Sequence, residues 1–536
     1  MSSAKRKKSE RRQKKHSSRK INEAKPAATA PDSRQEVVFK YLLSGLVFTY
    51  LLFYLFQLYA SLDNTFFWAD ENKHAYISSL VYETRQIPTI LPDDDLYGNY
   101  RWSYPPLFHI LGATSMAFAG PSALKYFNLI LLFIFLTSFY ILIQKHYGRN
   151  EARIACLLAT LAPVLATNTI RYTTEMLSML CLFYSFFFLL VALKKSDKRH
   201  ALISGLSTGL LMLSKQVGFV VFGFYGLLLL WFFWKNKQHF KIMLWLLGAA
   251  VATYSPYFVW AIYNRVEFLG FASVFLGISK KPEWSGTALK IFHKYDSGII
   301  EFAYLFYKGN GLLLAILLFL VIYYFISVRF KDEPQNYAFF LCIYLAIVMM
   351  AWHITNKRHT ILLLPFIAFL AGYAINQMTT NKMIIRGLIL LLLVIAGYMT
   401  YHMPNYRQKR NAPNEFVELA EFVKEDTAPD ARVLCLRKFD AIMYMQRPLI
   451  WPHARLNHAP IELLEKQSAD GLLLLLRKYK VQYIVIEVPL VVQVDKFGAA
   501  RYPLYFVRTC EQLERQGKIA FEAMTKSKRF ILLRVI

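Results

Sequence analysis

Long apolar runs recur along the first 400 or so residues of this chain, separated by short polar segments. A run of about 20 apolar residues has the length that crosses the hydrocarbon core of a bilayer as an α-helix. The segment 106–119 is apolar but too short to span, which favours an interfacial or re-entrant helix. The pattern predicts about eleven spanning helices, at roughly 38–60, 122–144, 152–168, 173–193, 200–214, 217–234, 240–262, 311–328, 336–352, 359–377 and 383–401.

The charges of the polar segments predict which ends of these helices face the cytoplasm. Residues 1–37 hold KRKKSERRQKK and almost no apolar residues, so they predict a disordered, basic, cytoplasmic tail. Alternation from that tail places KHYGRNEAR, LKKSDKRH, KNKQHFK, VRFKDEPQ and NKMIIR in the cytoplasm, and all carry Lys or Arg, as the positive-inside rule requires. HITNKRH is the exception, because it is basic and yet falls outside. We therefore predict a multi-pass plasma (inner) membrane protein with its N-terminus in the cytoplasm and an extracytoplasmic active site.

After about residue 402 the pattern changes from long apolar runs to short ones. NEFVELAEFVKE has the apolar spacing of a helix, and ARVLCL, VQYIVIEV and RFILLRVI are short runs typical of strands. Residues 403–536 are therefore predicted to form an extracytoplasmic α/β domain, following a transmembrane domain over 38–402. The sequence has no GxGxxG or P-loop motif, so no nucleotide-binding fold is indicated.

Composition agrees with a membrane protein. The chain is 56% hydrophobic, against about 45–50% for soluble domains. Its net charge of +28 is concentrated in the tail and loops, where it anchors topology and attracts anionic membrane lipids. The tail lacks the interleaved aromatics of a nucleic-acid binder, so no nucleic-acid partner is expected. Five scattered cysteines do not make a disulfide scaffold or zinc site; Cys435 and Cys510 could pair in an oxidising compartment, which their spacing cannot show.

Ionisable residues gather in the predicted outer loops. The first outer loop, 61–121, contains FFWADENKHAY; later loops contain NTIRYTTEM, LSKQV and TNKRH. Ionisable side chains at membrane depth are costly and are functional candidates for that reason. The candidates are Asp70, Glu71, His74, Arg101, Tyr104, Arg171, Glu175, Lys215, Arg358 and His359.

These residue types can together bind a phosphate group and accept a proton. Arginine binds phosphate bidentately and lysine acts as a point charge, so cations at the interface suit a phosphate headgroup. A carboxylate can accept a proton from an attacking hydroxyl or amine. Two adjacent carboxylates, Asp70 and Glu71, could also hold a divalent ion such as Mg²⁺ or Mn²⁺. The substrate implied is a lipid with an anionic leaving group.

Each candidate taken alone also has a structural interpretation. The pair Asp70 and Glu71 is a common surface feature. Lys215 could be a snorkelling lysine, and Arg358 and His359 could cap the next helix. Their co-location on one side of the membrane favours the functional interpretation.

The order of five motifs resembles the GT-C superfamily of membrane glycosyltransferases. The five motifs are the DE after the first span, YPPLFHILGA, RYTTE, GLSTGLLMLSKQVG and KRHTILLLP. The protein O-mannosyltransferase-like and aminoarabinose-transferase-like branches are the most similar. The likeness covers about 60–400 and the outer α/β domain that some members carry. Each motif is loose, but their order is more specific.

The resemblance implies an inverting transfer of sugar from a polyprenyl-phosphate donor to an extracytoplasmic lipid, glycan or protein acceptor. Asp70 matches the first-loop acid and would be the general base, with Glu71 beside it for metal or acceptor binding. Glu175 stands where many members have Asp, which leaves its role open. The expected roles are catalytic for Asp70, Glu71 and Glu175, donor phosphate-binding for Lys215, Arg358, His359 and Arg171, and substrate-binding for Tyr104, His74 and Arg101.

A transporter or flippase of lipid-linked sugars is the alternative function. Transporters often show internal repeats and broken helices near the midplane. The loops here show no two-fold repeat, and the ionisable residues lie at one interface rather than at mid-bilayer. The enzyme is therefore the favoured prediction.

Overall fold

The computed structural model describes the chain in a set of ranges. It divides into two compact units, Met1–Leu52 and Phe53–Ile536. The first holds most of helix α2 (Arg34–Ala60). The described residues are 34–62, 69–88, 105–264, 334–351, 357–378, 381–402, 415–435, 444–450, 461–464, 468–487, 504–526 and 530–536, with isolated positions at 304, 307, 311, 315, 316, 319, 320, 323, 441 and 528.

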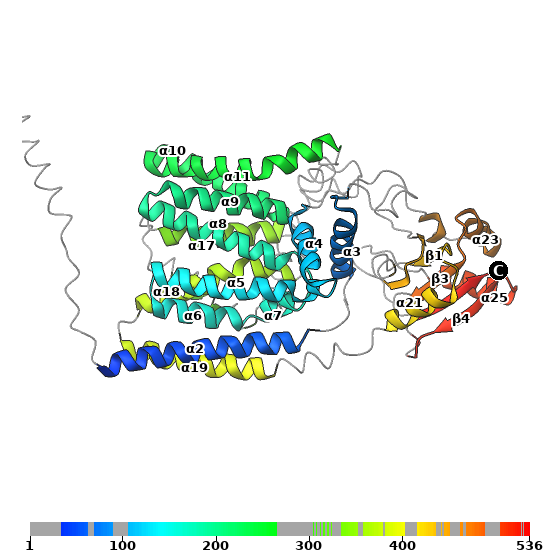
Figure 1. Cartoon of the computed structure of the whole chain (residues 1–536), viewed down its shortest axis with the longest axis horizontal. Helices are drawn as coiled ribbons and strands as arrows, with labels where there is room; N and C mark the ends of the chain where they lie inside the picture. The colour runs from blue at the N-terminus through cyan, green and yellow to red at the C-terminus, as the bar shows by residue number, and fades with distance from the viewer. Residues whose placement is uncertain are drawn as a thin grey trace, which may run out of the picture. The chain divides into compact units, whose positions relative to one another are not determined.

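The second unit contains a bundle of helices (Figure 1). They begin and end where polar loop segments meet apolar runs, as the hydropathy pattern predicts. They are α3 (Ala69–Thr84), α4 (Leu107–Ala119), α5 (Ala123–His146), α6 (Arg149–Thr160), α7 (Pro163–Thr169), α8 (Glu175–Lys195), α9 (Lys198–Ser214), α10 (Val217–Lys235), α11 (Lys237–Tyr263), α17 (Pro334–Ala351), the 3₁₀ helix η2 (Lys357–Leu363), α18 (Leu364–Met378) and α19 (Lys382–Tyr401).

Seven described helices are long and apolar enough to cross a membrane, or eight if the bent pair α6–α7 is one span. The helical membrane fold is therefore confirmed. Of the remaining predicted spans, 200–214 corresponds to α9 and 336–352 to α17, both shorter than a full span, while most of 311–328 lies outside the described residues. The segment 106–119 is the short apolar helix α4, as expected.

The predicted single span 152–168 is broken into α6 and α7, whose axes differ by 69°. Pro163 is the first residue of α7. Proline lacks the amide hydrogen that an α-helix needs in its interior, so a helix restarts at it more readily than it passes through it. The break gives the chain a short helix, α7, that leads directly into the loop before α8.

Helix α9 packs very closely on α11 because two glycines face it. A Cβ on Gly205 would lie 2.2 Å from the Leu246 carbonyl oxygen, and one on Gly209 would lie 2.5 Å from the Thr253 Cβ. Small residues four apart allow this approach in membrane helices. The packing fixes α9 beside both α11 and α8 (Figure 1).

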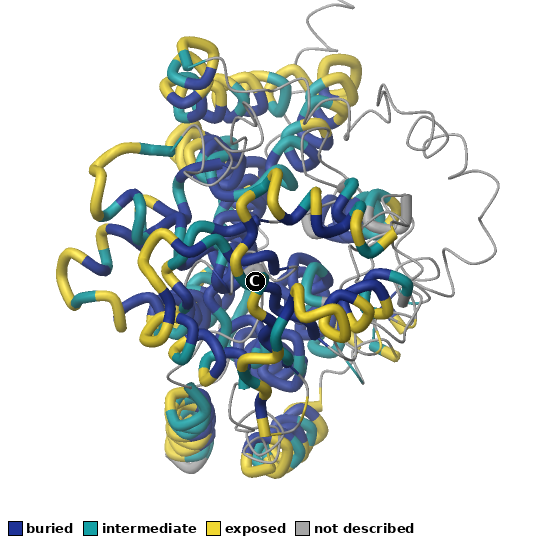
Figure 2. Tube along the Cα trace, turned by 90° about the vertical axis from the view of Figure 1, so that its right-hand side faces the viewer, coloured by how far each residue is buried: buried dark blue, intermediate teal, exposed yellow. Residues whose placement is uncertain are grey.

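Burial varies strongly between the helices. Helix α8 is buried along most of its length, whereas fewer than half of the residues of α10, α11 and α19 are buried. Figure 2 colours the trace by burial, with buried segments in dark blue and exposed positions in yellow. The exposed positions are largely apolar, such as Leu230 and Val394, which suits contact with lipid.

The residues after α19 form the predicted α/β domain. Helix α21 (Glu415–Asp426) is followed by β1 (Val433–Cys435), β2 (Leu449–Ile450), η3 (Ile461–Leu464), α23 (Ala469–Lys478), β3 (Tyr483–Glu487), α25 (Leu504–Arg515), β4 (Ile519–Met524) and β5 (Phe530–Val535). The strand order is β2-β1-β3-β5-β4. The pairs β1–β2 and β1–β3 are parallel, while β3–β5 and β4–β5 are antiparallel.

Alternate residues of this sheet enter two separate cores. Ile484 and Ile486 pack with α23 and α25, whereas Val485 between them packs with α21. This alternation is the period-two geometry of a strand covered on both faces. Cys435 belongs to the α21 core and Cys510 to the α23–α25 core, and both are free. The two cysteines therefore lie on opposite faces of the sheet and do not pair.

Candidate functional site

Three basic side chains converge on one buried carboxylate, that of Glu175. The Lys215 ammonium donates to Glu175 Oε1 at 2.7 Å. Arg358 Nε lies 3.1 Å and His359 Nδ1 3.3 Å from the same oxygen. Lys215 Nζ also lies 3.2 Å from His359 Nδ1. The four residues, here called the Glu175 cluster, come from the start of α8, the end of α9 and η2.

The Glu175 cluster has an excess of positive charge. Glu175 is 1% exposed, and it contributes one negative charge against the two permanent positive charges of Lys215 and Arg358. His359 adds a further positive charge only when protonated. Charges buried together in this way are strongly coupled, because removing one leaves the others uncompensated.

Lys215 reaches the cluster because α9 ends just before it. Its backbone is extended, with φ −160° and ψ 151°, and its amide still donates to Leu211 O at 2.9 Å. A Cβ on Gly218 would lie 2.5 Å from Met212 N, so the chain can fold back over the last turn of α9 only with glycine there. This tight turn between α9 and α10 places Lys215 at the end of the bundle.

Glu175 is the first residue of α8, where a negative charge suits the helix dipole. The Ser178 hydroxyl donates to Thr174 O at 2.8 Å and lies 3.3 Å from the Ser214 hydroxyl. The start of α8 is thereby joined to the last residue of α9. These contacts hold Glu175 and Lys215 on adjacent helix ends.

A second polar group lies between α3, α4 and the loop before α8. His74 Nδ1 lies 3.0 Å from His109 Nε2, and the hydroxyls of Ser78 and Tyr172 lie 2.7 Å apart. A Cβ on Gly112 would overlap the Tyr172 hydroxyl at 1.8 Å, so α4 needs glycine at this contact. Helix α4 also packs against α9. Helices α3 and α4 are thus attached to α9 and to the loop before α8, which lead into the Glu175 cluster.

Both histidines of this group are held neutral. Burial, with the positive charge of Lys73 second, lowers the pKa of His74 from 6.5 to about 3. Burial and the neighbouring His74 lower the pKa of His109 well below its usual value. His74 is 3% exposed. Its predicted substrate-binding role stays a prediction, and the structure places it inside the contact between α3 and α4.

The two predicted carboxylates of the first outer loop lie on α3. Asp70 is in its first turn, and only its backbone position is described. Glu71 is 1% exposed. Arg101 and Tyr104 lie outside the described residues. The catalytic and substrate-binding roles of these residues therefore stay predictions.

The residues predicted to bind phosphate are brought together in part. Lys215, Arg358 and His359 meet at Glu175, and their role in binding phosphate stays a prediction. Arg171 lies four residues before Glu175, where its carbonyl oxygen accepts a hydrogen bond from Asn128. The basic HITNKRH segment, which did not fit the loop-charge pattern, thus supplies the arginine that pairs with Glu175.

A metal site at Asp70 and Glu71 is not supported by the side chains that the structure describes. Within that part of the chain, no three His, Cys, Asp or Glu side chains are grouped as metal ligands. Because the Asp70 side chain is not described, a Mg²⁺ or Mn²⁺ ion there stays a prediction.

Two buried asparagines belong to the site but were missed from the sequence. Asn128 on α5 and Asn168 on α7 are 1% and 0% exposed. Both donate hydrogen bonds to backbone oxygens next to the Glu175 cluster. Their signal was an uncharged polar residue inside an apolar run, which marks a polar contact inside a membrane protein.

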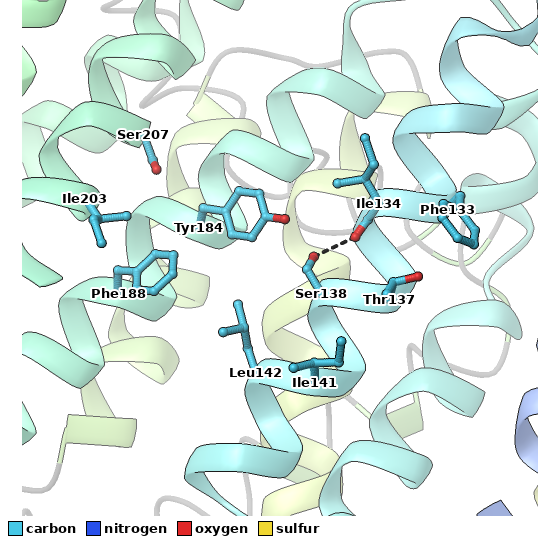
Figure 3. A pocket seen from close by; sticks show the side chains of 10 residues that line it. All are labelled: Phe133, Ile134, Thr137, Ser138, Ile141, Leu142, Tyr184, Phe188, Ile203 and Ser207. Atoms are coloured by element: carbon cyan, nitrogen blue, oxygen red, sulfur yellow. Dashed lines mark hydrogen bonds between the residues drawn. The ribbon is translucent and has the colours of Figure 1, made fainter.

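An apolar groove of about 610 Å³ lies between α5, α8 and α9, further along α8 than Glu175. Figure 3 shows Ile134, Tyr184 and Phe188 among the side chains around it. Figure 3 also shows the Ser138 hydroxyl, which donates a hydrogen bond to Ile134 O at 2.7 Å. Tyr184 lies nine residues beyond Glu175 on α8, or about 14 Å along the helix axis. The groove suits hydrocarbon and is separate from the polar cluster.

The chain resembles known proteins in one family model and in several structures. The model of the dolichyl-phosphate-mannose-protein mannosyltransferase family matches residues 103–260, less than a third of the chain. None of the curated protein sequences matches it.

Two solved structures share the fold over most of the chain. ArnT from Cupriavidus metallidurans, bound to undecaprenyl phosphate, matches with a TM-score of 0.63 at 13% identity, covering 91% of this chain and 98% of ArnT. The oligosaccharyltransferase AglB from Archaeoglobus fulgidus, in complex with an inhibitory peptide and a dolichol-phosphate, matches with a TM-score of 0.57 at 12% identity, covering 84% and 70% of the two chains. Both are GT-C glycosyltransferases. The predicted resemblance is thus confirmed, and the chain has the fold of the GT-C membrane glycosyltransferases.

Proposed function

We propose that this protein is an integral-membrane glycosyltransferase that moves a sugar from a polyprenyl-phosphate donor to an extracytoplasmic acceptor. The observation that carries the proposal is the Glu175 cluster, a buried group with excess positive charge at one end of a GT-C helix bundle. The family model and the two structural neighbours support it, because their descriptions name dolichyl-phosphate mannose, undecaprenyl phosphate and dolichol-phosphate.

The cations of the cluster would bind the phosphate of the donor. Lys215 and Arg358 already share Glu175 Oε1, so their positions are set before a ligand arrives. An arriving phosphodiester would bring a further negative charge to these two cations. The same cations stabilise the phosphate as the bond to the sugar breaks and negative charge develops on the leaving group.

Asp70 would act as the general base. In this mechanism its carboxylate takes the proton of an acceptor hydroxyl or amine. The acceptor atom bonds to the anomeric carbon from the face opposite the phosphate, and the carbon–oxygen bond to phosphate breaks with inversion. The polyprenyl phosphate leaves with the electron pair. Asp70 suits this role because it opens α3, which packs on α4, and α4 in turn packs on α9, the helix that ends at Lys215.

The apolar groove would bind the hydrocarbon chain of the donor. Its lining side chains come from α5, α8 and α9, and α8 also begins at Glu175. The roughly 14 Å between the two regions along α8 is short compared with a polyprenyl chain. A donor could therefore place its phosphate at the cluster and part of its chain in the groove.

The decisive experiment incubates purified protein with a panel of polyprenyl-phosphate sugars and lipid, glycan and protein acceptors. Mass spectrometry should detect an acceptor that gains one sugar, together with free polyprenyl phosphate. Movement of labelled lipid-linked sugar across a vesicle membrane with no glycosidic product would instead show a transporter. The glycosyltransferase proposal would then be wrong.

A further inference from the structure

Two buried asparagines, Asn128 on α5 and Asn168 on α7, bind backbone oxygens beside Glu175 and at Arg358. Asn128 Nδ2 donates to Asn168 O at 3.2 Å and to Thr173 O at 3.0 Å, and also contacts Arg171 O. Asn168 Nδ2 donates to Val164 O at 2.9 Å and to Arg358 O at 3.3 Å. One asparagine thus holds the loop that ends at Glu175, and the other holds the backbone of Arg358.

The loop before α8 needs these donors. The carbonyl groups of Arg171 and Thr173 lie outside the helices, and buried backbone oxygens must find a donor. Asn128 supplies one to each, and the Arg171 carbonyl also accepts from the Thr173 amide at 3.1 Å. The carbonyls also settle which way each amide points, because only the NH₂ end can face them. Within the described part of the chain, Asn128 Oδ1 and Asn168 Oδ1 are buried without a hydrogen-bond partner. Each amide therefore leaves its own acceptor unsatisfied while it binds these backbone oxygens, a cost that a purely space-filling residue would avoid.

We propose that Asn128 and Asn168 are positioning residues for donor phosphate, acting through Glu175 and Arg358 respectively. They set the separation of the carboxylate and the guanidinium from outside the cluster, so that the cations are placed before the phosphate binds. Neither asparagine is required to touch the donor. This inference rests on the proposed function, since it assigns the two residues to the same phosphate site.

The test replaces each asparagine with leucine, which has a similar shape and no hydrogen-bond donor. Asn376→Leu is the matched control, because Asn376 also makes an interhelical contact, donating to Glu151 Oε1 at 2.6 Å, but near the other end of α18. The probe is undecaprenyl phosphate, whose affinity is measured by titration of the full-length protein in detergent. Because a neutral hydrogen bond contributes about 0.5–1.5 kcal/mol, Asn168→Leu should weaken the affinity about three- to tenfold, and Asn376→Leu should leave it unchanged.

A double-mutant cycle separates positioning from general destabilisation. If Asn168 acts through Arg358, Asn168→Leu should have no further effect on affinity in an Arg358→Ala background. Asn128→Leu should keep its effect there, because it acts through the loop to Glu175. Independent, multiplying effects of Asn168→Leu and Arg358→Ala would overturn the proposal, as would an equal loss in Asn376→Leu.

Hydrogen exchange gives a readout that does not depend on donor binding. Amides of residues 170–175 should exchange faster in Asn128→Leu, and those of 357–363 faster in Asn168→Leu, with other regions unchanged. If Asn168→Leu does not fold, Asn168→Ala, which removes the donor without adding bulk, is measured in its place. Unchanged exchange in these segments would refute the positioning roles. If the wild type itself does not bind undecaprenyl phosphate, the proposed function fails, while the exchange rates still decide whether the asparagines position the cluster.

Discussion

A single carboxylate oxygen, Glu175 Oε1, lies within 3.3 Å of three basic groups in a site from which water is largely excluded. Sharing one anion keeps Lys215 and Arg358 close together despite their repulsion, which a phosphate-binding site requires. The cost is that removing Glu175 would leave two neighbouring buried cations without their shared anion. The consequences of single substitutions should therefore be large.

Lys215→Ala should weaken donor binding about ten- to a hundredfold, because a charge-assisted contact contributes roughly 1.5–3 kcal/mol. The measurement is the affinity of the purified variant for a polyprenyl-phosphate sugar. Lys195→Ala, at the exposed opposite end of α8, is the control and should bind normally. Unaltered donor affinity in Lys215→Ala would return that residue to the role of a snorkelling lysine.

Asp70→Asn should reduce turnover about 10²–10⁴-fold, because it removes the proton acceptor and keeps the size of the side chain. Folding and donor binding should persist. Glu71→Gln should be milder unless a metal is bound, in which case both variants lose metal dependence together. Initial rates against donor concentration, with and without Mg²⁺ or Mn²⁺, compare the two. An active Asp70→Asn beside an inactive Glu71→Gln would exchange their roles.

The neutral pair His74–His109 predicts an acid-sensitive fold. The pKa of His74 lies near 3 in the folded protein and near 6.5 when unfolded, so between these values the unfolded chain binds a proton that the folded chain does not. Stability should therefore be constant above pH 6.5 and fall below it, by up to about 1.4 kcal/mol per pH unit for each group. Thermal unfolding between pH 8 and 5 measures this. His74→Gln should reduce the slope below pH 6.5 and leave the curve above it flat; an unchanged slope would contradict the prediction.

At the scale of elements, the bundle depends on close helix contacts and on one broken span. Gly205 and Gly209 let α9 approach α11 closely. Pro163 begins α7, so α6 and α7 do not form one continuous helix. The hydropathy pattern predicted where the helices lie, because apolar length decides that. It did not predict the break, since a proline in a membrane helix can also be accommodated by a kink.

Gly205→Ala should destabilise the protein by roughly 1–3 kcal/mol, because its methyl group would meet the Leu246 carbonyl oxygen at 2.2 Å. Gly248→Ala, on the partner helix α11, is the control, since a Cβ there meets nothing within 4 Å. Thermal unfolding in detergent compares the two. Equal stability of both variants would show that α9 and α11 are not held this closely.

The strands of the C-terminal α/β domain were likewise predicted only in part. β1, β3 and β5 were predicted because each is a short apolar run. β2 was missed because it has two residues, and β4 because Phe521 and Met524 are exposed and the strand lacks a buried face. Both missed strands lie at the edges of the sheet, where the sequence is least constrained by packing.

At the scale of the whole molecule, the sequence predicted the helical membrane fold and the α/β domain at its C-terminal end. It predicted Lys215 and Arg358 on one side but not their shared contact with Glu175, because pairing depends on how α8, α9 and η2 pack. Asn128 and Asn168 were missed for the same reason: they bind backbone atoms, and no residue pattern records a backbone partner.

The topology prediction belongs to this scale. The N-terminus should be cytoplasmic and residues 405–536 extracytoplasmic, because eleven crossings put the two ends on opposite sides and the basic loops face the cytoplasm. A reporter-fusion map tests it, with fusions at residues 30, 197 and 450. A cytoplasmic signal at residue 450 would refute eleven crossings and separate the outer domain from the proposed site.

The burial of the cysteines has a practical consequence. All five, Cys156, Cys181, Cys342, Cys435 and Cys510, are free and buried, and burial raises the pKa of the Cys510 thiol to about 12, which leaves almost no reactive thiolate at neutral pH. The native protein should therefore react poorly with membrane-impermeant maleimides. Labelling of a single cysteine introduced at an exposed position could therefore be measured without first removing the native thiols.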